Sequence, residues 1–223
     1  MNYFAHGMRF TDRPWFLAGT ALPDWLSVAD RAVRLRSREV LPLAESEDPI
    51  EADLASGILQ HLHDDHWFHR SRAFVEIAGS VAHHFRQTLG PEDGFRPGFL
   101  GHIATELLLD GVLIDEHPQL LEAYYDALDR LDPDRLQAAV NRMSRTPTER
   151  IAPLVPLFRR EQFLRDYVDP KRLLYRLNQV MRRIKLKPLP DEIEEVLVSG
   201  WAIVKPRSRE LLPETHFQFA MFR

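Results

Sequence analysis

Apolar residues recur along this chain mainly with the period of an α-helix. In the segment 50–69, for example, Leu54, Ile58, Leu62 and Phe68 follow one another near helical spacing. No Asn-Gly or Asp-Gly hairpin signal lies between alternating apolar runs. The pattern therefore predicts an all-α fold, a bundle of many helices.

The same pattern predicts where the helices and the main loops lie. Pro23 should bend or divide the first helix, and Gly200 should stop the last one. The acidic stretch 41–49 and the segment with Gly90, Pro91, Gly94, Pro97 and Gly98 are expected to be loops. Helices are predicted over 15–30, 50–69, 71–89, 99–114, 117–131, 134–143, 147–158, 161–168, 170–184 and 191–200.

The composition indicates one folded domain over residues 1–223. With 44% hydrophobic residues and 10 glycines the chain can bury a substantial core, and it shows no internal repeat. A net charge of −4 argues against a general nucleic-acid or membrane-surface binder. The start of the chain does not resemble a signal peptide, and we expect no membrane span and a cytoplasmic location.

The absence of cysteine limits the chemistry that the chain can carry. No thiolate ligand or cysteine nucleophile is possible, so any metal site must consist of His, Asp and Glu. The sequence also contains no Gly-rich phosphate loop, no dinucleotide fingerprint and no G-x-S-x-G elbow. Metal-assisted catalysis is the catalytic option that the remaining residues support.

Two segments carry candidate metal ligands at helical spacing. His61, Asp65 and His69 are four residues apart and therefore share one helix face, whereas His63 and His66 point elsewhere. His102 and Glu106 repeat the four-residue spacing inside the most apolar predicted helix. A buried Glu needs a cation or a hydrogen-bond donor, which makes the second pair the more informative one.

An ordinary explanation stands beside the metal site. A single His and carboxylate four residues apart are usually a hydrogen-bonded pair on a helix surface. Two such pairs, one of them in an apolar helix, make a site for one or two divalent ions an equal alternative. Asp110 continues the second stripe as a ligand, an orienting group or a surface charge.

Four segments form a further pattern: Asn2-Tyr-Phe-Ala-His6, the stretch from Leu17 to Asp24, Gly57-Ile-Leu-Gln-His61 with Asp65, and His102 with Glu106. In this order they resemble the zinc-dependent phospholipase C superfamily. The acyl-carrier-protein phosphodiesterases look like closer relatives, and the resemblance covers residues 1 to about 110. The resemblance implies an all-α phosphoric-ester hydrolase with its metal site in this half and His69 without a counterpart. The implied ligands are His6, Asp24, His61, Asp65, His102 and Glu106.

The leading hypothesis is a metal-dependent phosphodiesterase-type hydrolase. A zinc, manganese or iron ion would activate a water molecule, with Asp65 or Glu106 as base or bridging carboxylate. The expected substrate is a phosphate ester, with a carrier-protein-bound phosphopantetheine as one option.

Three alternatives compete with this hypothesis. The first is a non-catalytic binding or scaffold protein with a structural or degraded metal site. The second is an HD-domain phosphohydrolase that uses His63 and Asp64. A non-haem iron oxidase ranks last, because such bundles use Glu-x-x-His spacing and this chain offers His-x-x-x-Glu.

Overall fold

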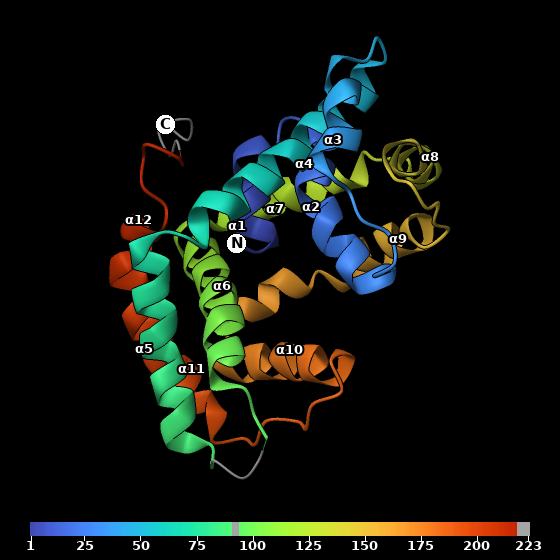
Figure 1. The fold of residues 1–223 in the computed structure, drawn as a ribbon. Coiled ribbons are helices and arrows are strands. Elements are labelled where there is room, and N and C mark those ends of the chain that lie inside the picture. Colours follow the sequence, from blue (N-terminus) through green and yellow to red (C-terminus); the bar gives the residue numbers. More distant parts are fainter. Residues whose placement is uncertain (91–93, 218–223) are drawn as a thin grey trace. The chain divides into compact units, whose positions relative to one another are not determined.

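The computed structural model describes residues 1–90 and 94–217, and the fold there is all-α. Twelve α-helices form in these residues and no strand does; the chain pairs in β fashion only at an isolated bridge between Leu35 and Ser144. The predicted fold class is confirmed. The contacts divide the chain into two compact units (Figure 1).

Unit 1 contains residues 1–66 and 117–163 of the described chain. In it α1 and α2 pack against each other and against α7, and α2 and α7 also contact α9. Aromatic side chains join these helices, with the Phe158 ring 5.2 Å from that of Tyr3 and 5.3 Å from that of Trp25. Its helices are α1 (Tyr3–Gly7), α2 (Pro14–Ala29), α3 (Ser37–Val40), most of α4 (Pro49–Phe68), α7 (Pro118–Asp129), α8 (Pro133–Met143) and α9 (Ile151–Glu161).

Unit 2 contains residues 67–90, 94–116 and 164–217 of the described chain. Three of its helices, α5, α6 and α11, lie side by side and pack against one another (Figure 1). Its helices are α5 (Arg72–Thr88), α6 (Pro97–Glu116), α10 (Pro170–Arg183), α11 (Ile193–Val204) and α12 (Ser208–Leu211).

The chain passes repeatedly from one unit to the other. One crossing falls inside α4, after His66, and further crossings follow Glu116 and Phe163. Each unit is therefore discontinuous in sequence. The expectation of one domain over 1–223 remains a prediction.

Helix α6 is long and apolar enough to cross a membrane, judged by its length and composition alone. Most of the helix is buried inside the structure, and core helices of soluble proteins meet the same criteria. The expectation that the chain has no membrane span stays a prediction.

Several predicted boundaries were wrong for local reasons. Pro23 lies inside an undivided α2, where Leu22 and Trp25 on either side of it are buried. Gly200 lies inside α11, because the absence of a side chain there leaves room for Leu108 of α6. Gln162, in the left-handed region with φ of 42°, separates α9 from the 3-10 helix η4 (Phe163–Val168) that replaces the predicted 161–168 helix.

The two predicted loops also differ from the structure. Part of the 41–49 loop is the 3-10 helix η2 (Leu41–Glu45). Pro97 and Gly98 begin α6, since proline suits the first turn of a helix, and Pro91 lies outside the described residues. The short helices α1, α3 and α12 were not predicted.

Candidate metal centre

His6 lies on α1, the first helix of unit 1. Its neighbours Tyr3 and Phe4 are buried, and the Phe4 ring lies 6.0 Å from that of Tyr124 on α7. These contacts hold α1 against the unit 1 core. The whole His6 residue is buried as a result, with 0% of its surface exposed.

Two glycines bring α2 and α4 into close contact. A Cβ added to Gly19 would lie 2.9 Å from the Gly57 Cα, and one added to Gly57 would meet the backbone of Phe16. Only glycine fits such a crossing. The crossing brings the Thr20 carbonyl, one residue after Gly19, within 2.8 Å of the His61 Nδ1 on the next turn of α4.

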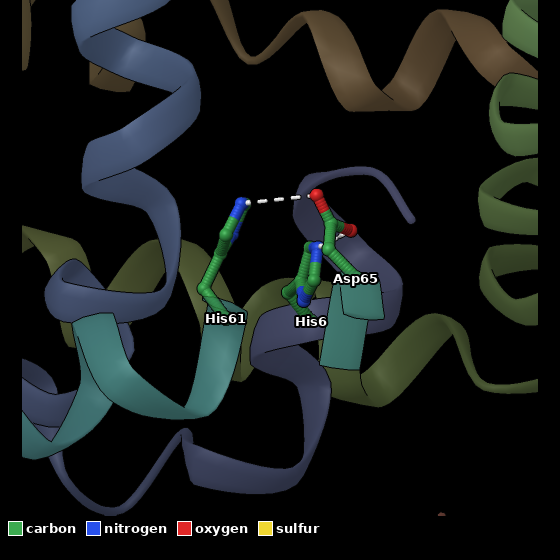
Figure 2. A group of neighbouring side chains, drawn as sticks. All are labelled: His6, His61 and Asp65. Carbon is green, nitrogen blue, oxygen red and sulfur yellow. Dashed lines mark ion pairs between the residues drawn. The ribbon is translucent and has the colours of Figure 1, made fainter. Parts of the chain in front are cut away.

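His6, His61 and Asp65 converge on one another (Figure 2). The His6 Nε2 lies 3.2 Å from the Asp65 Oδ1, and the His61 Nε2 lies 3.5 Å from its Oδ2. The two imidazole rings are stacked with centroids 4.0 Å apart. One ligand atom from each residue lies within 4.8 Å of the others, so this group could hold a metal ion.

The hydrogen bond between His61 and Thr20 determines which ring nitrogen faces the centre of the group. A carbonyl oxygen only accepts, so Nδ1 must donate and carry the proton in the neutral ring. The Nε2 lone pair of His61 is therefore available on the side of Asp65. Metal-binding histidines commonly use this arrangement, with one nitrogen on the ion and the other on a backbone or carboxylate oxygen.

Charges around Asp65 stabilise its ionised form. Burial by itself would raise the pKa of Asp65, but the close approach of His6 and His61 and the nearby N-terminal ammonium hold it well below the usual range. The Met1 ammonium nitrogen is 2.8 Å from the Asp65 Oδ1. Conversely, burial would lower the pKa of His61, but Asp65 and Asp24 raise it. Asp65 is thus a carboxylate at neutral pH, as a metal ligand must be.

Asp24 lies near this group without belonging to it. Burial raises the pKa of Asp24, although the charges of His61 and His6 act in the opposite direction. The structure does not include it with His6, His61 and Asp65 in one ligand group. Its role as a ligand, implied by the resemblance, stays a prediction.

The donor set fits a divalent cation. Neither ring nitrogen of His6 makes a hydrogen bond of good geometry within the part of the chain that the structure describes, although both are buried. Buried polar atoms normally have a partner, so a group that lacks one indicates a missing ion or water. Two imidazoles and one carboxylate are a common ligand set for catalytic zinc and for non-haem iron.

A second group of the same composition forms in unit 2. His69, in the turn after α4, and His102, on α6, both direct Nε2 at the Glu106 Oε1, at 2.6 and 3.3 Å. The Phe74 ring packs against both imidazoles, at 5.1 and 4.9 Å. This group could also hold a metal ion.

The environment of Glu106 keeps this carboxylate ionised. Burial would raise the pKa of Glu106, but hydrogen bonds from His102 and His69 bring it well below its usual range. Asp110, one turn further along α6, is fully buried. The structure does not place Asp110 in the ligand group, and its predicted role is untested.

Six of the seven predicted ligands thus fall into two groups of three, and Asp24 belongs to neither group. His6 joins His61 and Asp65, as the resemblance implied, whereas His69 accompanies His102 and Glu106 and not the stripe of His61 and Asp65. The helix ends at Phe68, one residue before His69.

Sequence reasoning missed two supporting groups in unit 1, the Thr20 carbonyl and Arg9. It named Asp64 only in the HD-domain alternative, together with His63. Arg9 and Asp64 are buried and paired, with the Arg9 Nη2 2.7 Å from the Asp64 Oδ2. The spacing gives a weak signal for them, since Arg9 and Asp64 each follow a predicted ligand histidine by three residues.

Two arginines of the C-terminal half, Arg159 and Arg176, are engaged in contacts within the chain. Arg159 donates hydrogen bonds to the carbonyls of Leu128 and Leu131. Arg176 pairs with Asp166 at 2.6 Å. These contacts indicate structural roles for both side chains.

Comparisons with protein-family models, curated proteins and solved structures found no match for this chain. A function for the chain must therefore be inferred from the geometry of its site. That geometry provides two groups of His, Asp and Glu that could each hold a metal ion.

Proposed function

We propose that this chain is a metal-dependent hydrolase of phosphate esters, with its cation bound by His6, His61 and Asp65. The observation that carries the proposal is the convergence of two buried imidazoles on one ionised carboxylate. A zinc, manganese or iron ion held there would supply Lewis-acid activation of water and of a phosphoryl oxygen.

The carboxylates of unit 1 suit different tasks. Asp65 is held ionised by its cationic neighbours, so it binds a cation well and accepts a proton poorly. The pKa of Asp24 is raised by burial, so this carboxylate is the more basic of the two. Asp24 is therefore the better proton acceptor, and Asp65 acts as a ligand.

The types of ligand atom in the site also limit which ions it can bind. His61 is held with Nε2 toward Asp65 by the Thr20 carbonyl, so in the neutral ring this nitrogen carries the lone pair that coordinates a cation. His and carboxylate ligands together favour zinc, manganese or iron over calcium, which prefers oxygen ligands. We expect a phosphodiester to be the substrate class, and a non-catalytic scaffold is the rival that the experiment must exclude.

The test is metal analysis of the purified protein, followed by an assay on bis-p-nitrophenyl phosphate with added manganese or zinc. We expect bound cation and ion-dependent turnover in the wild-type protein. Asp65→Asn should lose the turnover and the cation bound by His6, His61 and Asp65. The matched control is Asp53→Asn on the same helix, where Asp53 forms an exposed pair with Arg13. No cation above trace and no turnover with either ion would refute the proposal.

A further inference from the structure

Asp64 is a buried carboxylate beside the proposed cation site. It precedes Asp65 on α4, has 0% of its surface exposed, and its Oδ2 accepts a hydrogen bond from the Arg9 Nη2 at 2.7 Å. Its Oδ1 accepts a second one from the Gln60 Nε2 at 2.8 Å. The same Oδ2 that binds Arg9 lies 3.7 Å from the His6 Nδ1.

These contacts fix the orientation of the Asp64 carboxylate. Both oxygens are held by donors on different elements, since Arg9 belongs to the 3-10 helix η1 (Met8–Phe10) and Gln60 to α4. A buried charge needs such partners to offset its lost hydration. An ion pair between Arg9 and Asp64 alone would not require His6 to lie against the same oxygen.

The two histidines of the site are oriented in the same way. In each ring Nδ1 faces an oxygen, the Thr20 carbonyl for His61 and the Asp64 carboxylate for His6. In each ring Nε2 faces Asp65. In the His6 ring the Asp65 Oδ1 is the nearer acceptor, 3.2 Å from Nε2, so the proton position is determined only once a cation lies between them. A cation on Nε2 requires the proton on Nδ1, where the Thr20 carbonyl and the Asp64 carboxylate can accept it.

We propose that Asp64 is a positioning residue, which holds the His6 imidazole with its proton on Nδ1 and its Nε2 directed at the cation. This role rests on the proposed function, because it concerns the same site. Asp64 acts through His6 and does not itself bind the ion. Asp64 thus has the same role for His6 that the Thr20 carbonyl has for His61.

The first measurement is made on the wild-type protein loaded with zinc, which is diamagnetic. Nitrogen-15 NMR of the His6 ring distinguishes the protonated nitrogen from the coordinating one directly. We expect the proton on Nδ1. A proton on Nε2 would overturn the inference, whether or not any variant folds.

The second measurement compares cation affinity in variants by calorimetric titration with manganese. The double variant Arg9→Met/Asp64→Leu removes both buried charges together, so neither is left unpaired. We expect it to lose the single His6 tautomer and to bind manganese about 10–100-fold more weakly, as for other groups that orient metal ligands. The control Asp53→Asn should match the wild type.

The outcomes separate this inference from the proposed function. Wild-type tautomer and affinity in the folded double variant would overturn the role of Asp64 and leave the proposed function intact. A wild-type protein that binds no manganese would refute the proposed function, and the positioning role with it.

Discussion

At Asp65 one carboxylate meets three nitrogen groups, and its chemistry follows from them. The Met1 ammonium and the rings of His6 and His61 all stabilise its charge. Asp24, a few residues into the second half of α2, is half-buried and has a raised pKa instead. Two side chains of one type therefore differ in function because their surroundings differ.

This difference predicts the effect of removing the Asp24 charge. Asp24→Asn should lower the turnover number on bis-p-nitrophenyl phosphate by about 10²–10⁴-fold, the usual contribution of a proton-transfer group. Manganese affinity, measured by titration calorimetry, should stay within about threefold, since a group outside the ligand set contributes little to binding. A parallel loss of affinity would show that Asp24 is a ligand.

His61 and His63 provide a matched pair on one helix. His61 is buried with Nε2 toward Asp65, whereas His63 is exposed. His61→Ala should abolish cation binding at this site, and His63→Ala should leave it unchanged, as measured by metal analysis after dialysis. Loss of the ion in His63→Ala alone would favour the HD-domain alternative.

Residue types and spacing predicted most of the residues in these two sites, but not all of their partners. Residues four apart share one helix face, because four residues make about one helical turn. This spacing correctly paired His61 with Asp65 and His102 with Glu106. It also placed His69 with the wrong partners, since the helix ends just before it. The pairing of Asp64 with Arg9 was missed because the two residues lie 55 positions apart in sequence.

At the level of helices, the contact between α2 and α4 determines the geometry of the site. It depends on the absence of side chains at Gly19 and Gly57. The periodicity of apolar residues predicted both helices, but not that they would meet at these glycines. The helix α1 escaped prediction because its five residues are too short to show a period.

Gly57→Ala should therefore disturb both stability and the site. The added methyl group would meet the Phe16 backbone, and overpacking of this kind costs about 1–3 kcal/mol. We expect a lower free energy of unfolding in urea and weaker cation binding, because Thr20 moves away from His61. Gly79→Ala is the control: nothing lies within 4 Å of the added Cβ on α5, so stability should rise by about 0.5–1 kcal/mol. Equal effects of the two substitutions would contradict the role of the crossing.

At the level of the whole chain, each unit contains its own group of two histidines and one carboxylate. Composition already favoured a large helical core. No spacing rule could divide the ligands between units, because that division depends on contacts between segments far apart in sequence.

Cation stoichiometry tests the two groups separately. Manganese titration of the wild-type protein should give about two bound ions per chain. Glu106→Gln should remove one of them and Asp65→Asn the other, because each variant destroys one ligand group. Loss of the same single ion in both variants would instead show that the seven predicted ligands serve one centre.

The crossings of the chain between its units also have a consequence for dissection of the gene. A fragment that stops after Glu116 lacks α7 and α9, which pack against α1 and α2, and it also lacks α11, which packs against α5 and α6. No single cut yields two fragments that each contain one complete unit and nothing else. The coding sequence therefore cannot be divided at one point into two modules that match the two units.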